Sequence, residues 1–99
     1  MATTPLTINH DDNGAKGRFF IGDPQAPDGL MTYVWAGPTS FIIDHTEVGD
    51  RLAGQGAGKQ LVMAAVDFAR SRKVTILPLC PFAKSVFERS PDIADVLAR

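Results

Sequence analysis

The stretch Arg51-Leu52-Ala53-Gly54-Gln55-Gly56-Ala57-Gly58-Lys59 decides the fold of this chain, because it stands between a strand-like run and a helix-like run. Its three glycines occupy every second position, so side chains do not block a ligand's approach to the backbone N–H groups. Residues 60–72, which follow, have the periodicity of a helix, whose positive dipole end would face these N–H groups. The stretch, called the glycine loop below, is therefore predicted to bind a phosphate group.

Two common phosphate-binding patterns do not fit the glycine loop. A P-loop that ends at Gly58 and Lys59 requires glycine at position 53 and serine or threonine at position 60. This chain has Ala53 and Gln60 there, so the hydroxyl that would hold magnesium is missing. A dinucleotide fingerprint that starts at Gly54 requires a third glycine at position 59, which is a lysine. Nucleotide hydrolysis and dinucleotide binding are therefore rejected.

A third pattern, [QR]-x-x-G-x-[GA], fits in full. Arg51 takes its first position, and Gly54 and Gly56 take its glycine positions. In this respect the loop resembles the coenzyme A pyrophosphate loop of the GNAT N-acetyltransferase superfamily. The alternative is a glycine-rich turn that only caps the following helix, and the glycines alone do not separate the two readings.

Length and composition indicate a soluble globular protein. The 99 residues suit one domain, which we expect over residues 1–99. A formal net charge of −1 favours neither nucleic acid nor an anionic membrane as a partner. The single cysteine, Cys80, cannot form an internal disulfide, and no Cys/His group has zinc spacing, so no metal is expected. We see no secretion signal and no apolar run of membrane-spanning length, so the expected location is cytoplasmic.

Four strands are predicted before the glycine loop, from alternating apolar and polar residues and from β-branched and aromatic content. They cover residues 6–10, 18–21, 30–36 and 40–48. A turn at 11–14 contains Asn-Gly, the strongest short hairpin signal. Residues 22–29, with two prolines and two glycines, are predicted to be a surface loop. The result is an antiparallel meander.

Beyond the glycine loop the pattern changes to helical spacing, with Leu61, Ala65 and Phe68 on one face of the helix over residues 60–72. A fifth strand over 74–79 should run parallel to the fourth, because a helix crosses between them. Pro78 should end its pairing. Short helices are predicted over 82–89 and from 91 onward. The predicted class is α+β, in the order β-β-β-β-α-β-α-α.

This order and three motifs resemble an abbreviated GNAT fold, and in particular a family of very small GNAT-like acetyltransferases of roughly one hundred residues. The motifs are His45-Thr46-Glu47-Val48, Gly54-Gln55-Gly56-Ala57-Gly58 and Pro78-Leu79-Cys80-Pro81-Phe82. They occur in the family's order, and the resemblance spans most of the chain. It implies a fourth and a fifth strand that part to admit acetyl-coenzyme A.

The resemblance also implies a path for this cofactor. Backbone groups near Glu47 and Val48 would pair with the pantetheine arm as an extra strand. The side chains of Arg51 and Lys59 would serve as counter-charges for the pyrophosphate. That group would rest on the backbone N–H groups of Gly54, Gln55, Gly56, Ala57, Gly58 and Lys59.

Three side chains are candidates for the chemistry. Cys80 stands where the strands should part, next to the expected thioester, and would either accept the acetyl group or only assist removal of the amine proton. His45 and Glu47 are expected on one strand face near the cysteine, with Asp44 and Thr46 on the other. Histidine titrates near neutral pH, which suits a base for an ammonium substrate.

The chain also departs from the family. Many GNAT enzymes carry a tyrosine after the fifth strand as a proton donor, and Val86 stands at that position. The leading hypothesis is an acetyl-coenzyme A-dependent N-acetyltransferase that acts on a primary amine such as a protein lysine, a polyamine or a small metabolite. The alternative is a module that binds acyl-coenzyme A with little catalysis. A monomer or weak dimer is expected, and the sequence names no particular amine.

Overall fold

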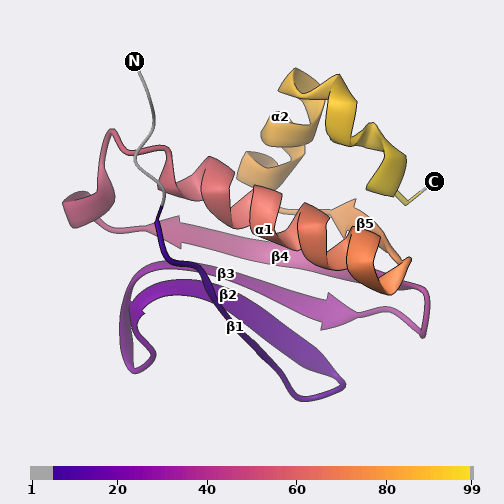
Figure 1. The fold of residues 1–99 in the computed structure, drawn as a ribbon, viewed down its shortest axis with the longest axis horizontal. Helices are drawn as coiled ribbons and strands as arrows, with labels where there is room; N and C mark the ends of the chain where they lie inside the picture. The colour runs from indigo at the N-terminus through magenta and orange to yellow at the C-terminus, as the bar shows by residue number, and fades with distance from the viewer. Residues whose placement is uncertain (1–5, 99) are drawn as a thin grey trace.

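The computed structural model describes residues 6–98, whose strands form one five-stranded sheet in the order β1-β2-β3-β4-β5 (Figure 1). The strands are β1 (Asn9–Asp12), β2 (Lys16–Asp23), β3 (Ala26–Trp35), β4 (Ser40–Val48) and β5 (Thr75–Pro78). Neighbours from β1 to β4 are antiparallel, and β5 lies parallel to β4. The predicted α+β class and the predicted strand order are confirmed.

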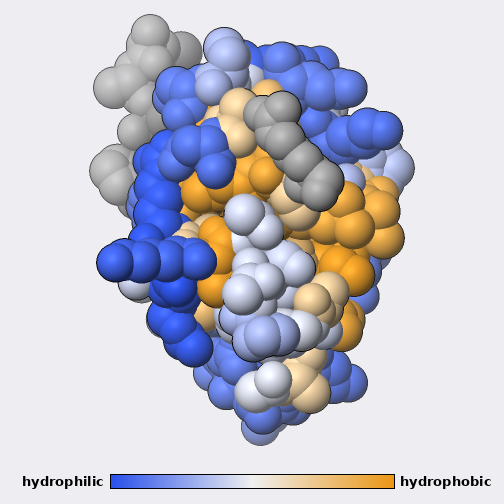
Figure 2. Space-filling view, turned by 90° about the vertical axis from the view of Figure 1, so that its right-hand side faces the viewer, coloured by the Kyte–Doolittle hydropathy of each residue, from blue (hydrophilic) through white to orange (hydrophobic). Residues whose placement is uncertain are grey.

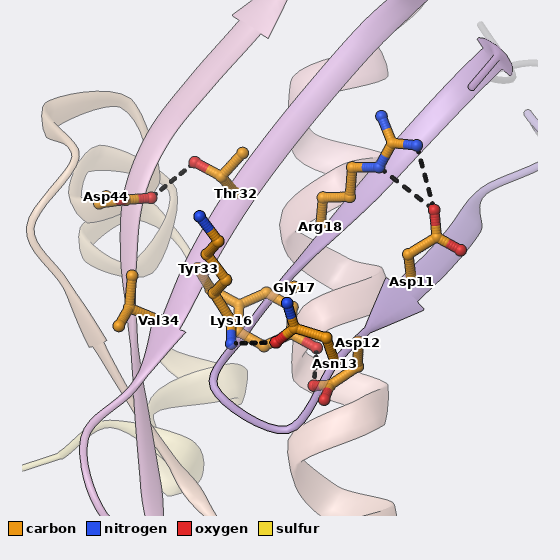
Figure 3. Close-up of a pocket in the computed structure, with 10 residues that line it drawn as sticks. All are labelled: Asp11, Asp12, Asn13, Lys16, Gly17, Arg18, Thr32, Tyr33, Val34 and Asp44. Atoms are coloured by element: carbon orange, nitrogen blue, oxygen red, sulfur yellow. Dashed lines mark hydrogen bonds and ion pairs between the residues drawn. The ribbon is translucent and has the colours of Figure 1, made fainter. Parts of the chain in front are cut away.

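Helices cover one face of this sheet (Figure 1). They are η1 (Asp50–Leu52), α1 (Ala57–Arg72), α2 (Pro81–Arg89) and η2 (Pro91–Val96), of which η1 and η2 are 3₁₀ helices. Helix α1 packs across β2 to β5, and α2 packs against α1, β4 and β5. We call the other side of the sheet the open face; Figure 3 looks onto it, with α1 behind. Among residues 6–98, no helix is both long enough and apolar enough to cross a membrane.

The core lies between the sheet and α1. The helix contributes small and aliphatic side chains at helical spacing, as predicted, and the sheet contributes larger ones from alternate positions of its strands. Fully buried side chains include Met31, Tyr33, Phe41, Ile43, Leu61, Val62, Ala65, Val66 and Ala69. This packing fixes where α1 begins and therefore where the glycine loop lies.

The first hairpin differs from its prediction. β1 begins later than expected, so Asp11 and Asp12 lie in the strand rather than in a turn. All four residues of β1 are exposed, and an edge strand of this kind shows no apolar alternation in its sequence. The turn itself is held by Asn13, whose Oδ1 accepts hydrogen bonds from the backbone N–H groups of Ala15 and Lys16.

A hydrogen-bonded network joins β1 to β3. The ring of His10 stacks on Phe19 at a centroid distance of 4.2 Å, and its Nε2 lies 2.5 Å from the hydroxyl of Tyr33. Tyr33 and Trp35 both donate to Asp12 Oδ2. Burial raises the pKa of the Asp12 carboxyl, but these two donors and a backbone N–H group outweigh burial, so the pKa lies below its ordinary value.

The surface loop predicted at residues 22–29 was wrong. β2 and β3 continue through this segment and meet at a two-residue turn, Pro24-Gln25. The register shifts between Ile21 and Gly22, and Pro27 pairs at that irregularity. A bulge is one of the few places where a strand accepts proline, which is why the composition of the segment was misleading.

β4 contains a bulge of its own, at Asp44. Thr32 pairs with His45 and the next residue of β3 pairs with Ile43, so Asp44 is an extra residue that opposes nothing. The bulge shifts the alternation by one residue beyond Ile43, which is fully buried on the helix side. Thr46 therefore faces the helices, where it pairs with buried Met31. The prediction that Asp44 and Thr46 share a face was wrong.

The parallel pairing of β4 with β5 stops halfway along β4. It runs from the pair Ser40 and Thr75 to the pair Ile43 and Pro78. The carbonyl of Ile43 then accepts hydrogen bonds from both Leu79 N–H and Cys80 N–H, at 3.0 and 3.1 Å. Beyond this point β5 has ended, and residues 44–48 of β4 have no partner from β5. The split that Pro78 predicted is therefore present.

Smaller boundary differences follow local geometry. Helix α1 begins at Ala57, before the predicted residue 60, because Gly56 caps it in a left-handed conformation. The last predicted helix is the 3₁₀ helix η2, after which Leu97 forms a bridge to Ile76 of β5.

Candidate active site

The glycine loop forms the N-terminal cap of α1. Gly54 and Gly56 have φ angles of 77° and 69°, in the left-handed region that favours glycine. The N–H group of Gln60 bonds to the carbonyl of Gly56 at 3.0 Å, which closes the first turn. The N–H groups of the three residues before it have no acceptor within an α-helix. These amides are suited to an anion.

The charges around the cap agree with an anion ligand. The first turn of α1 contains no acidic residue, although acidic residues are favoured there, and it contains the cation Lys59. A lysine at the positive end of a helix is unfavourable by itself. An anion bound at this end of the helix would attract Lys59 and make its position favourable.

A cavity of about 490 Å³ lies beside the cap, within the size range of small-molecule sites. Six of the predicted cofactor residues line it: Val48, Gly54, Gly56, Ala57, Gly58 and Lys59. The opposite wall comes from α2 and the residue after it: Phe82, Ser85, Val86, Arg89 and Ser90. The sequence had marked Val86, at the position of the family's tyrosine, but did not show that this helix forms a wall of the cavity.

The third glycine has a packing role that the sequence did not show. A Cβ atom on Gly58 would lie 2.4 Å from Cζ of Phe82, so the ring of Phe82 rests directly on this glycine. Phe82 is 42% exposed and forms part of the cavity wall. Gly58 therefore lets α2 approach α1 and shapes the cavity.

The remaining predicted cofactor residues lie outside the cavity wall. Arg51 is largely exposed, and its Nη1 lies 3.7 Å from Oδ1 of Asp28. The side chain of Gln55 turns back and donates to the carbonyl of Arg51 at 3.1 Å. Glu47 precedes Val48 on β4, with its side chain exposed.

Cys80 lies at the point where β4 and β5 part, as N-cap of α2 and two residues beyond the end of β5. It is buried, and its Sγ lies 3.4 Å from Oγ1 of Thr46. Burial raises the pKa of the thiol, but hydrogen-bond donors outweigh burial, so the pKa of Cys80 lies below its ordinary value. These donors are the Thr46 hydroxyl and the backbone N–H groups of Ala83, Phe82 and Thr46.

His45 and Glu47 form an exposed pair on the open face. Nε2 of His45 lies 3.8 Å from Oε2 of Glu47, and both side chains are more than half exposed. The bulge places this pair on the sheet face opposite Thr46, whose hydroxyl contacts Cys80. The structure therefore brings His45 and Glu47 together but does not bring them to the cysteine. The base candidates and the thiol flank the gap between β4 and β5 from opposite faces.

The open face also carries a shallow groove of about 540 Å³ (Figure 3). Its polar wall includes an ion pair between Arg18 and Asp11, and a hydrogen bond of 2.6 Å from Thr32 to Asp44. Among residues 6–98, no group of three or more His, Cys, Asp or Glu side chains is arranged to hold a metal ion.

Comparison with known proteins identifies the family. Residues 18–96 match the family model described as GCN5-related N-acetyl-transferase. A GCN5-like protein from Staphylococcus aureus, solved by NMR, is 35% identical, over 99% of this chain and 91% of that chain, with a TM-score of 0.75. The fold and these matches thus define an acyltransferase. The chain belongs to the GCN5-related N-acetyltransferase family.

More distant structures share the fold. A GNAT family acetyltransferase from Elizabethkingia anophelis, solved with acetyl-CoA bound, has a TM-score of 0.63 at 11% identity, over 87% of this chain and 74% of that chain. A ribosomal-protein-alanine N-acetyltransferase from Brucella melitensis has a TM-score of 0.61 at 15% identity, over 88% and 64%. No curated protein matches this chain in sequence.

Proposed function

We propose that this protein transfers an acetyl group from acetyl-coenzyme A to a primary amine. One observation carries the proposal: the unpaired edge of β4 connects the glycine loop at the start of α1 to Cys80, the single cysteine of the sequence. Val48 lines the cavity beside the cap, and Thr46 contacts Cys80. These positions are two residues apart along the strand, a span of about 7 Å. A ligand held by its phosphates at the cap can thus extend along this edge and present a thioester to Cys80.

The backbone of β4 would bind the connecting arm of coenzyme A. On the part of β4 that β5 leaves unpaired, the N–H and C=O groups of Val48 face the open edge, whereas those of Glu47 face β3, because Gly49 N–H bonds to the carbonyl of Asp28 on that side. Backbone groups of this kind favour a hydrogen-bonding partner that lies as an extra strand. Arg51 and Lys59 would act as the nearby cations, with Arg51 released from Asp28.

The chemistry we propose uses the two faces of the sheet for two tasks. On the helix side, the Cys80 thiolate attacks the acetyl carbonyl, the bond from that carbon to the coenzyme A sulfur breaks, and coenzyme A leaves as a thiolate that water protonates. On the open side, the ammonium form of the substrate gives one proton to His45, supported by Glu47. The neutral amine then attacks the acetyl-cysteine, the bond from the acetyl carbon to the Cys80 sulfur breaks to regenerate the thiolate, and the nitrogen releases its second proton to water as the amide forms.

The covalent route has a direct test. Incubation with acetyl-coenzyme A but no amine should add one acetyl group to Cys80, detected by intact mass and located by peptide mapping. An unmodified cysteine together with rapid acetyl transfer would show that the amine attacks the thioester directly.

Binding is tested with a matched pair of glycine variants. Gly54 and Gly37 both have positive φ and open space around the position of a Cβ atom, so Gly54→Asp and Gly37→Asp impose similar backbone strain. Only Gly54 lines the cavity. By isothermal titration calorimetry, Gly54→Asp should weaken coenzyme A binding at least tenfold, and Gly37→Asp should not. Equal affinity in the two variants would contradict a phosphate site at the cap.

A binding module without catalysis is the second candidate, favoured by one observation. Val86, at the position of the usual tyrosine, is buried and has no proton to donate. Turnover with a panel of lysine peptides, polyamines and small amines separates the two functions, because a module would bind coenzyme A tightly and acetylate none of them. We also propose a cytoplasmic monomer or weak dimer that binds neither nucleic acid nor membranes.

A further inference from the structure

Thr46 lies on the face of β4 opposite to the one that the sequence pattern predicted. Strict alternation from buried Ile43 would direct His45 toward the helices and Thr46 toward the open face. The extra residue Asp44 reverses this order, so the hydroxyl of Thr46 reaches the helix side. There it lies 3.4 Å from the sulfur of Cys80.

We propose that Thr46 is a positioning residue for Cys80: its hydroxyl holds the sulfur at the gap between β4 and β5 and stabilises the thiolate form. The inference deepens the proposed function and rests on it, because a positioned thiolate matters only if Cys80 receives the acetyl group. The residue acts through the cysteine and is assigned no contact with the acetyl carbon.

The surroundings of the sulfur support this role. Cys80 is 7% exposed, so water contributes little to stabilising a negative sulfur, and hydrogen-bond donors must replace it. The groups that shift the pKa of Cys80 are neutral: the Thr46 hydroxyl and backbone N–H groups from the start of α2 and from Thr46 itself. Within residues 6–98, no charged side chain is among these groups. The hydroxyl is the one side chain among them, and it can be removed without touching the backbone.

The test measures the reaction of Cys80 with iodoacetamide as a function of pH, in the protein without coenzyme A. The midpoint of the rate profile reports the thiolate, and the plateau at high pH reports access to the sulfur. Thr46→Val removes the hydroxyl at constant shape and should raise the midpoint by about one pH unit, as expected for the loss of a hydrogen bond to a charged group. Thr46→Ser should restore it.

Two further variants make the result decisive. Thr46→Ala removes the hydroxyl without risk of overpacking beside Met31, and should shift the midpoint in the same direction. Thr32→Val is the matched control, because its hydroxyl bonds to Asp44 on the open face, and it should leave the midpoint unchanged. An unchanged midpoint in both Thr46→Val and Thr46→Ala, or a change in the plateau alone, would overturn the inference.

The alkylation profile tests the role of Thr46, and the acetyl-transfer assay tests the proposed function, so the two proposals can be refuted separately. A shifted midpoint with no acetyl transfer by any variant would refute the proposed function while the contact between Thr46 and the sulfur stands. Normal transfer with an unshifted midpoint would leave the enzyme intact and remove Thr46 from its mechanism. With both intact, Thr46→Val should lower kcat at pH 7 about tenfold and leave KM for acetyl-coenzyme A within twofold.

Discussion

The contact between Gly58 and Phe82 supports a quantitative prediction about the cap of α1. Replacing Gly58 with alanine would place a methyl group 2.4 Å from Cζ and 2.6 Å from Cε2 of Phe82. Ordinary carbon contacts lie at about 3.5 Å or more, so the ring must retreat by about 1 Å. Phe82 is 42% exposed and its ring tip can swing outward, which places the cost near the low end of the usual range for overpacking.

Two opposing effects set the change in the free energy of unfolding that we expect for Gly58→Ala. Overpacking of this kind costs about 1 to 3 kcal/mol. Alanine in place of a helical glycine stabilises by up to about 1 kcal/mol. Gly58→Ala should therefore lower the free energy of unfolding by about 0 to 2 kcal/mol in the natural chain. With Phe82→Ala already present, the methyl group meets no ring, and the same change should raise the free energy of unfolding by up to about 1 kcal/mol.

A double-mutant cycle isolates this contact. Urea unfolding of the natural chain, both single variants and the double variant can be followed by the fluorescence of Trp35, the single tryptophan. Its ring packs on Phe41 at a centroid distance of 5.5 Å and reports the integrity of the core. We expect a coupling energy of at least about 1 kcal/mol between the two sites. An equal effect of Gly58→Ala in both backgrounds would refute the packing role of Phe82.

Three further predictions concern the chemistry and the first hairpin. Cys80→Ala should reduce acetyl transfer at least a hundredfold and leave coenzyme A affinity within twofold, by steady-state kinetics and calorimetry; full activity would remove the cysteine from the reaction. His45→Ala should move the acid limb of the pH–rate profile, because imidazole is the base we assign to the amine, and an unmoved limb would count against that role. Tyr33→Phe should cost about 1 to 2 kcal/mol of stability at pH 7 by urea unfolding. Because the pKa of Asp12 is lower in the folded chain, its contribution is present above the unfolded value of 3.8 and lost as pH falls, so the difference between Tyr33→Phe and the natural chain should narrow below that pH.

The order of elements could be read from the sequence because each long element carried its own periodicity. β4 (Ser40–Val48) was predicted with its observed bounds, and Pro78 marked the end of parallel pairing. The elements that were predicted wrongly are those whose conformation is set by tertiary contacts rather than by local sequence. β1 is polar at every position, and Pro27 lies in a strand because a bulge accommodates it.

The candidate site was predictable in its backbone and less so in its side chains. Glycine spacing located the cap of α1, since glycine conformation is a local property. Phe82 and Thr46 were missed because their roles depend on how α2 and β4 approach other elements. The separation of His45 from Cys80 was missed for one reason, the extra residue in β4, which no alternation pattern reveals.

That extra residue makes β4 tolerant of a change in length at one position. Deleting Asp44 would leave Ile43, His45 and Thr46 in strict succession, inward, outward and inward, which is the arrangement they already have. Deleting His45 would have the same result, with Asp44 in its place, whereas deleting Thr46 or Glu47 would move neighbouring side chains to the opposite face. Natural variants of this protein that are one residue shorter are therefore expected to have lost it opposite Thr32, and nowhere else along the strand.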